Sequence, residues 1–159
     1  METTPALEQL SEFIADIEVA MLTTVDRTGR LHSRPMMALR SMAEGALWFF
    51  TQGSSHIVDD VNAHHPVNAC YVDSALGRYV SVSGRARVVT DRARISELWE
   101  SRLTKWMPGG AEDASVVLIR VEVQEAESWV WGNEGEVTAS IELSTKGGGV
   151  RNEKISFRS

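Results

Sequence analysis

Apolar residues follow two different periods along the N-terminal part of the chain. They recur every three or four positions over 7–17, which predicts a helix. Thr4 and Pro5 suit its start, because a hydroxyl caps helix N–H groups and proline fits the first turn. From 19 to 25 the period becomes two, and 26–29 (DRTG) is typical of a tight turn. Residues 31–39 then complete a predicted β-hairpin.

Pro35 lies inside the second strand of this hairpin. Proline lacks the N–H that a sheet ladder needs, so it is confined to edge strands and bulges. The sequence therefore predicts that 31–39 forms a sheet edge or a point where regular pairing ends.

Two further strands flank a short helix in the middle of the chain. Residues 46–51 (ALWFFT) and 67–72 are apolar runs bounded by glycine or proline. Between them we expect a helix that Ser54 and Ser55 cap and that Pro66 ends. Its inward-facing residues are expected to be Ile57, Val58 and Val61.

The clearest alternation in the chain runs from 79 to 88. Even positions there are small or apolar and odd positions are mainly polar, so one face of this strand is expected to be buried. Asp91 is expected to cap a helix that 106–110 (WMPGG) breaks. A last strand covers 115–123 and continues toward Trp131.

This order of elements has too many adjacent strands for a doubly wound parallel sheet. An antiparallel barrel with helices at its rim fits better, so the expected fold class is mainly β with peripheral helices. One domain is expected over 1–132. After it the pattern fades, and the glycines at 147–149 and the polar end predict that 133–159 is a flexible C-terminal extension.

Composition narrows the class of protein. Of 159 residues, 43% are hydrophobic and 24% charged, which suits one folded domain and excludes a disordered chain. A formal net charge of −6 argues against a duplex-binding domain, since those are normally basic. The single cysteine, Cys70, rules out an intrachain disulfide and a CxxC site. With no signal-peptide pattern and no apolar run of about 20 residues, we expect a cytoplasmic protein that binds no membrane.

Few residues suggest metal or nucleophilic chemistry. His64 and His65 are sequence neighbours and cannot both face one ion from a regular helix, so no metal site is expected. We interpret them as residues at the negative end of a helix. No Ser-His-Asp spacing stands out, and no glycine-rich loop follows a strand in phosphate-binding form.

Two segments are more specific, and each has two interpretations. Arg34 directly precedes Pro35 and is either a solvated side chain of an edge strand or a guanidinium directed at an anion. Ser54, Ser55 and His56 gather at an expected helix start. They either cap that helix or bind a phosphate, which helix N-termini favour.

Six segments taken in order carry a resemblance to a known family. They are 21–24 (MLTT), 33–36 (SRPM), 47–51 (LWFFT), 55–56 (SH), 79–84 (YVSVSG) and 106–110 (WMPGG). Together they resemble the pyridoxamine 5′-phosphate oxidase-related FMN-binding split barrels, and most closely the bacterial general stress protein type. The resemblance covers about residues 7–132.

This resemblance implies a six-stranded antiparallel split β-barrel that forms a homodimer and binds FMN at two intersubunit sites. Carried over by position, the cofactor-binding residues from one chain would be Arg34, Pro35, Met36, Phe49, Phe50, Thr51, Ser54, Ser55 and His56. Those from the other chain would be Tyr79, Trp106 and Trp129. Arg34 would approach the flavin phosphate or ribityl chain, and the Pro35-Met36 backbone the ring edge. Phe49, Phe50 and Thr51 would line ring and ribityl, while the serines and His56 would hold the phosphate.

Two departures from the family pattern bear on function. Ile57 stands where the family commonly carries a phosphate-binding lysine. Either one cation is lost, so that Ile57→Lys would tighten FMN binding, or Ile57 packs inward and another group supplies the charge. Glu134 and Glu136 lie near where the true oxidases carry basic residues for a phosphorylated vitamin, so pyridoxine 5′-phosphate oxidase activity is not expected.

The resemblance favours a small FMN-dependent oxidoreductase that exchanges two electrons with a nicotinamide or another small-molecule partner. The cofactor would carry that chemistry, and no side chain is assigned as catalytic. The alternatives are a non-catalytic flavin carrier or redox sensor, and a split barrel that uses deazaflavin or haem.

Overall fold

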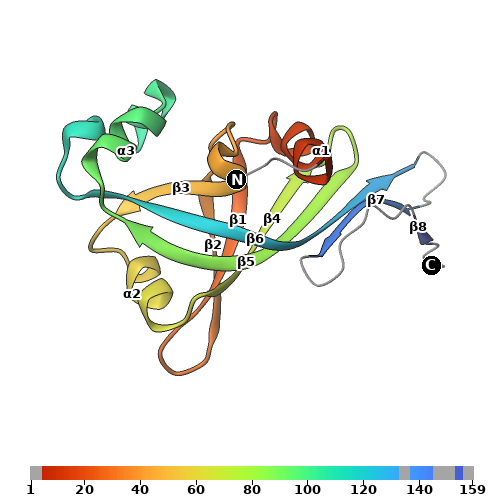
Figure 1. Cartoon of the computed structure of the whole chain (residues 1–159), viewed down its shortest axis with the longest axis horizontal. Helices are drawn as coiled ribbons and strands as arrows, with labels where there is room; N and C mark the ends of the chain where they lie inside the picture. The colour runs from red at the N-terminus through yellow and green to blue at the C-terminus, as the bar shows by residue number, and fades with distance from the viewer. Residues whose placement is uncertain (1–4, 133–136, 145–152, 156–159) are drawn as a thin grey trace.

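The computed structural model describes residues 5–132, 137–144 and 153–155, which form a strongly curved antiparallel sheet with helices beside it (Figure 1). The helices are α1 (Pro5–Ile14), α2 (His56–Ala63) and α3 (Arg92–Leu98), and the short 3-10 turns are η1 (Ala43–Gly45), η2 (Ser101–Lys105) and η3 (Gly110–Glu112). The strands are β1 (Val19–Val25), β2 (Leu31–Met37), β3 (Ala46–Gln52), β4 (Pro66–Asp73), β5 (Arg78–Val89), β6 (Val116–Trp131), β7 (Val137–Ser144) and β8 (Glu153–Ile155).

The strand order confirms the predicted fold class. Within the described residues the hydrogen-bonded order is β2-β1-β4-β5-β6-β7-β8, and β3 pairs with β6. Every pairing is antiparallel. Strands β1 to β6 are the six antiparallel strands that the sequence predicted, and the helices lie at the rim of their curved sheet.

Strand β2 is an edge strand, as its proline predicted. Among the described strands its ladder runs along β1 alone, where Pro35 lies opposite Met21. Just beyond the strand, Ala38 forms one isolated bridge with Phe49 of β3. The free side of β2 is therefore where the backbone can meet something other than a neighbouring strand.

Strand β3 is buried on both faces, which explains its uninterrupted apolar run. Leu47 and Phe49 face the main core, which α1 and α2 also enter, whereas Trp48 and Phe50 face a second core beneath α3 and η2. The long strand β6 supports both cores, because it pairs with β3 and with β5. Gly84 permits the β5–β6 approach at their register shift, since a Cβ there would overlap the carbonyl oxygen of Glu122.

The helix that Asp91 begins is shorter than predicted. Asp91 accepts a hydrogen bond from the Ala93 N–H at 3.0 Å, so the predicted cap is confirmed. The sequence predicted one helix up to the WMPGG break, but α3 ends at Leu98 and the chain resumes as η2. Trp99 has an extended backbone, and its ring packs edge-on against Phe50 with 5.1 Å between centroids. We attribute the break to this tertiary contact.

Two strands that the sequence did not predict extend the sheet beyond Gly132. Strand β7 pairs with β6, and β8 pairs with β7. The other residues of 133–159 lie outside the described part of the chain. The division into a 1–132 domain and a flexible extension therefore stays a prediction. Residues 137–144 and 153–155 belong to the same sheet as the predicted domain.

Candidate functional site

Arg34 is tied to helix α2. Its Nη1 donates to the Thr24 hydroxyl at 2.6 Å, and its Nη2 lies 3.3 Å from the Asp60 carboxylate. The Thr24 hydroxyl donates in turn to Asp60 at 2.8 Å. Thr24 and Asp60 are buried, while 25% of the Arg34 side chain is exposed. A guanidinium carries five N–H donors, so this network leaves Arg34 donors for a ligand outside.

This network lies beside the start of α2. His56 and Asp60 are four residues apart on the helix, which places them on one helix face. The structure therefore brings Arg34 to the helix that follows Ser55, although the two segments are far apart in the sequence. Sequence analysis had treated them as two separate candidates.

The N-terminus of α2 has no side-chain cap from Ser55. Ser55 occupies the N-cap position, but its hydroxyl lies 3.1 Å from the hydroxyl of Thr51 and caps nothing. Simple capping by Ser55 is thus wrong. Ser54 and His56 are exposed. The first N–H groups of a helix favour an anion when no side chain caps them, so the start of α2, with the Thr51 and Ser55 hydroxyls beside it, suits an anion. Arg34 pairs with Asp60 one turn further along the helix.

Ile57 faces away from this position. Ile57 is only 4% exposed and belongs to the main core with Val58 and Val61, as predicted for the inward face of the helix. Of the two explanations for the missing family lysine, inward packing is the one the structure supports. A lysine at 57 would bury its ammonium in the core, so the expectation that Ile57→Lys tightens FMN binding is corrected here.

The other residues expected at the flavin from the same chain differ in exposure. Pro35 is exposed on the edge strand, whereas Met36 is 8% exposed and its backbone pairs with Ala20 of β1. Phe49 and Phe50 are buried in two different cores on opposite faces of β3. Their assignment as residues that line the flavin stays a prediction. Because both rings are buried, any contact with a flavin would be made by their backbone.

The three residues expected from the partner chain lie elsewhere on the molecule. Tyr79 and Trp129 are opposite each other on β5 and β6. This end of β5 lies against α1, because the Arg78 guanidinium stacks 5.3 Å above the ring of Phe13. The other end of β5 lies by α2. Trp106 follows η2 and is 56% exposed. One chain alone therefore does not bring Tyr79 or Trp129 to the start of α2.

One face of the sheet carries exposed apolar side chains beside polar ones such as Thr23 and Ser33 in the described part of the chain. Cross-strand partners on β2, β1 and β4 share this face, with Met21 opposite both Pro35 and Cys70. Its exposed apolar side chains are Val19 at 45%, Met21 at 42%, Leu31 at 71% and Val72 at 51%. Exposed apolar surface on this scale typically marks an interaction site.

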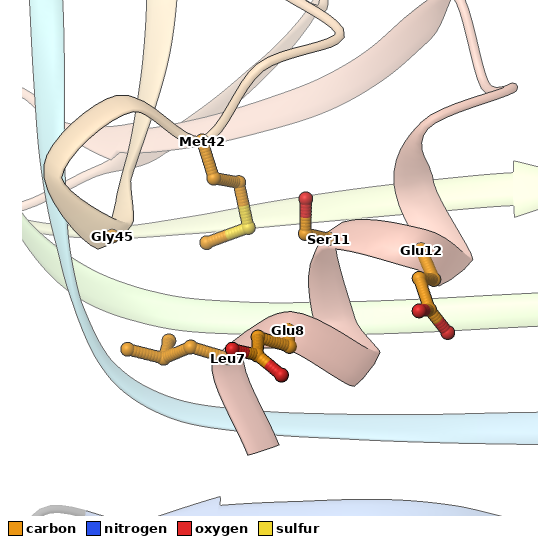
Figure 2. Close-up of a pocket in the computed structure, with 6 residues that line it drawn as sticks. All are labelled: Leu7, Glu8, Ser11, Glu12, Met42 and Gly45. Atoms are coloured by element: carbon orange, nitrogen blue, oxygen red, sulfur yellow. The ribbon is translucent and has the colours of Figure 1, made fainter. Parts of the chain in front are cut away.

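Three cavities lie apart from the start of α2, and one of them, of about 350 Å³, is lined by Tyr79 and Trp131 among others. The cavity in Figure 2, of about 290 Å³, lies between α1 and the loop before β3. Glu8 and Glu12 line it together with Leu7, Ser11, Met42 and Gly45. Two carboxylates repel a phosphate, so this cavity does not suit the phosphate of FMN. Another cavity, of about 440 Å³, lies beside η2.

Metal and membrane features are absent from the described residues. No three His, Cys, Asp or Glu side chains there are grouped to hold a metal ion. His65 instead lies with Nδ1 3.2 Å from the carbonyl oxygen of Ala86. None of the described helices is long and apolar enough to cross a membrane.

Sequence reasoning missed two members of the Arg34 network. Thr24 is 10 positions and Asp60 is 26 positions from Arg34, so no local pattern joins them. The sequence feature that could have pointed to this network is Asp60 itself. It is a carboxylate beside Val61 on the face of a predicted helix that was expected to pack inward, and a buried charge needs a partner.

Comparison with known proteins identifies relatives in sequence. A family model described as pyridoxamine 5′-phosphate oxidase like matches residues 5–148. Protein bli-3 of Neurospora crassa is 33% identical over 151 residues. The match covers 88% of this chain and 66% of that protein, just under two thirds of its length.

Solved structures agree with the fold. The general stress FMN/FAD binding protein of Xanthomonas citri is 26% identical with a TM-score of 0.66, over 80% of this chain and 90% of that chain. A pyridoxamine 5′-phosphate oxidase-related, FMN binding protein of Nostoc punctiforme has a TM-score of 0.68 over 98% of this chain and 100% of that one. At 13% identity, that likeness shows the split-barrel fold alone. The predicted split barrel and the resemblance to general stress proteins are confirmed, and this chain belongs to the pyridoxamine 5′-phosphate oxidase-like family.

Proposed function

We propose that this chain binds FMN as a homodimer and uses it for two-electron redox chemistry with a small-molecule partner. The observation that carries the proposal is the uncapped start of α2, where the Thr51 and Ser55 hydroxyls meet and from which Arg34 is one helical turn away at Asp60. The names of two relatives support the choice of cofactor, since one is called FMN/FAD binding and the other FMN binding. The cytoplasm is the proposed compartment, supported by one unpaired cysteine, Cys70.

The phosphate of FMN fits the start of α2 by charge and by hydrogen bonding. Backbone N–H groups at a helix N-terminus, two hydroxyls and a guanidinium are the donors that a phosphate monoester accepts from. Asp60 holds the Arg34 guanidinium against α2, so little side-chain entropy would be lost on binding. Arg34 thus supplies the cation that the inward-facing Ile57 does not.

The flavin ring would lie along the free side of β2. Pro35 has no backbone N–H and is on the sheet edge, so its carbonyl group, which alternates away from β1, is open to a planar ligand. When bound, FMN supplies the capacity to accept and donate two electrons. The chain's own residues bind the phosphate, orient the ring and exclude water from one side of it.

A second copy of the chain completes the proposed site. Tyr79 and Trp129 lie at the α1 end of the sheet, away from α2, so a flavin that contacts both sets of residues needs two chains. The exposed apolar face of β1, β2 and β4 would be buried between them. Obligate interfaces of this kind commonly exceed about 2,000 Å². Sedimentation of a stable, flavin-loaded monomer at micromolar concentration would contradict the dimer.

Phosphate recognition is tested by titrating flavin-free protein with FMN and with riboflavin, which lacks the phosphate. Arg34→Met should weaken FMN binding about 10- to 100-fold, because a hydrogen bond to a charged group contributes roughly 1.5–3 kcal/mol. Riboflavin binding should change much less. Flavin fluorescence quenching at fixed salt measures both affinities.

The matched control is Arg27→Met, which removes one positive charge from the exposed turn between β1 and β2. It should leave both affinities within about twofold of the unchanged protein, since exposed charges interact weakly in salt. Equal changes in FMN and riboflavin affinity on Arg34→Met would show that the phosphate is not bound here, and the site assignment would be wrong.

The alternative functions separate by two measurements. The absorption spectrum of the purified protein distinguishes flavin from deazaflavin and haem. An oxidoreductase should oxidise NADH or NADPH at a higher rate than free FMN does. A flavin carrier or redox sensor should not. Pyridoxine 5′-phosphate is not expected to be oxidised, and saturable hydrogen peroxide formation from it would contradict that expectation.

A further inference from the structure

The sheet face opposite the main core carries charges of opposite sign at its two ends. Successive cross-strand partners lie on one face of a sheet. One such row across β1, β4, β5 and β6 is Met21, Cys70, Ser81 and Glu127. The exposed apolar side chains of β1, β2 and β4 therefore continue onto β5 and β6 as a charged surface. Helices α1 and α2 pack into the main core on the other face, so neither covers this surface.

The end of the charged surface toward the start of β6 is basic. Arg87 lies opposite Arg120, and Arg85 is two positions before Arg87 on the same side of β5. Both Arg85 and Arg87 are exposed. Burial lowers the pKa of Arg120 from its ordinary value, and the charge of Arg87 lowers it further, so the two guanidinium groups repel each other. Glu122 lies opposite Arg85 and offsets part of this positive charge.

The end of the charged surface toward the end of β6 is acidic. Glu125 and Glu127 are exposed, and they lie opposite Ser83 and Ser81 of β5. Strand β7 adds Glu142 at the register position opposite Glu127. The polarity of the surface thus reverses along β6, from arginine at one end to glutamate at the other.

Ion pairs within the chain do not neutralise these ends. Among the described residues, the exposed charged side chains of the two ends form no ion pair and no side-chain hydrogen bond; they are Arg85, Arg87, Glu125 and Glu127. Like charges directly opposite each other, as in Arg87 and Arg120, destabilise a sheet. A second copy removes this cost if ends of opposite charge meet, because a twofold dimer brings the same surface of both copies together.

The direction of the twofold axis decides which ends meet. Two identical sheet faces packed against each other are related by an axis in the plane between them, because the rotation must turn one face over onto the other. An axis along the strands places the basic end of one copy on the basic end of the other. An axis across the strands places each basic end on an acidic end. Electrostatic complementarity therefore favours the axis across the strands.

We propose that a second copy of this chain packs on the charged surface with the twofold axis across the strands. Arg87 of each copy then lies against the partner's Glu127, and Arg85 against the partner's Glu125. Packed sheets are about 10 Å apart, a gap that arginine and glutamate side chains span together. The inference rests on the proposed function for the homodimer alone, and the orientation of the two copies follows from the charge pattern.

The test measures which chains pair, so its result does not depend on how tight the dimer is. Full-length Arg87→Glu and Glu127→Arg chains are mixed in equal amounts, unfolded in urea and refolded together at low salt, with and without FMN. Native mass spectrometry then counts the mixed dimers and both homodimers. Both variants are expected to fold, because each substitution places opposite charges at cross-strand positions, 87 with Arg120 and 127 with Glu142.

The mixed dimer should dominate, because only it pairs opposite charges at both contacts. If each homodimer is tenfold weaker than the mixed dimer, mixed dimers should form about 90% of all dimers, against about half for random pairing. The matched control mixes Arg27→Glu, the same charge change in the β1–β2 turn, with Glu127→Arg. Random pairing is expected there, because one contact is matched and one mismatched in the mixed dimer.

Two results would overturn the proposed orientation. Random pairing of Arg87→Glu with Glu127→Arg would show that the two ends do not meet. An excess of mixed dimers between Arg87→Glu and the unchanged chain would place the Arg87 side chains of both copies together, as an axis along the strands requires.

The outcomes also separate this inference from the proposed function. Chains that stay monomeric with and without FMN would refute the homodimer and its orientation together. Dimers that bind FMN but pair at random would refute the orientation alone. An excess of mixed dimers from the two charge variants, in protein that binds no FMN, would refute the flavin function and leave the orientation standing.

Discussion

The buried pair between Arg34 and Asp60 gives the sharpest test of how this fold holds its candidate site. Asp60 is 7% exposed and accepts hydrogen bonds from Thr24 at 2.8 Å and Arg34 at 3.3 Å. We consider Arg34→Met, which keeps the length of the apolar stem but removes the guanidinium. The carboxylate of Asp60 is then left in the protein interior with one neutral hydroxyl as its partner.

The expected cost follows from burial. Removing one partner of a fully buried ion pair typically destabilises a protein by about 3–5 kcal/mol. Because 25% of the Arg34 side chain is exposed, water screens part of this interaction, and we expect a loss of about 2 kcal/mol. Asp60→Asn keeps a hydrogen-bond acceptor and should cost about 1 kcal/mol. The double variant should also cost about 2 kcal/mol, which is less than the sum, because no carboxylate is then stranded.

The assay is urea unfolding of flavin-free protein, so that ligand binding does not contribute to stability. Unchanged protein, both single variants and the double variant form one double-mutant cycle. The coupling free energy should be about 1 kcal/mol, and Arg34→Met should lower Tm by about 4–8 °C for a chain of this size. Arg27→Met serves as the control and should change the free energy of unfolding by less than about 0.5 kcal/mol. Additive single effects would refute the inference that Arg34 neutralises Asp60.

Two further predictions test other parts of the structure. Ile57→Lys should destabilise the protein by at least about 2 kcal/mol without tightening FMN binding, because position 57 is 4% exposed in the main core; unchanged stability in urea would contradict the inward placement. The pKa of Asp26 lies well below its usual range because the Thr28 hydroxyl and His32 hydrogen-bond to its carboxylate. A carboxyl group whose pKa is lower in the folded than in the unfolded protein stabilises the fold at pH values above its unfolded pKa of about 4. This stabilisation is lost as the pH falls toward the folded pKa. The destabilisation caused by Asp26→Asn should therefore be larger at pH 7 than at pH 3, and equal losses at the two pH values would speak against it.

Local patterns in the sequence determined most of the elements. The alternation over 19–25 and 79–88 marks two of the strands, since side chains on a strand face opposite sides in turn. Pro35 marks the edge strand because it cannot donate to a ladder on both sides. Asp91 marks the start of α3 because its carboxylate accepts from the helix itself. Each signal acts between residues close in the chain, so it can be recognised without the fold.

Tertiary structure alone decided where helix α3 ends and which charges meet. Trp99 packs against the ring of Phe50 where α3 ends, and no helix propensity near Trp99 contains that contact. The partner of Arg34 is 26 residues away on α2, and the Ala38 carbonyl oxygen that Arg102 binds is 64 residues away. These features result from packing between segments distant in the chain, whereas the periodic pattern of a sequence specifies each segment by itself.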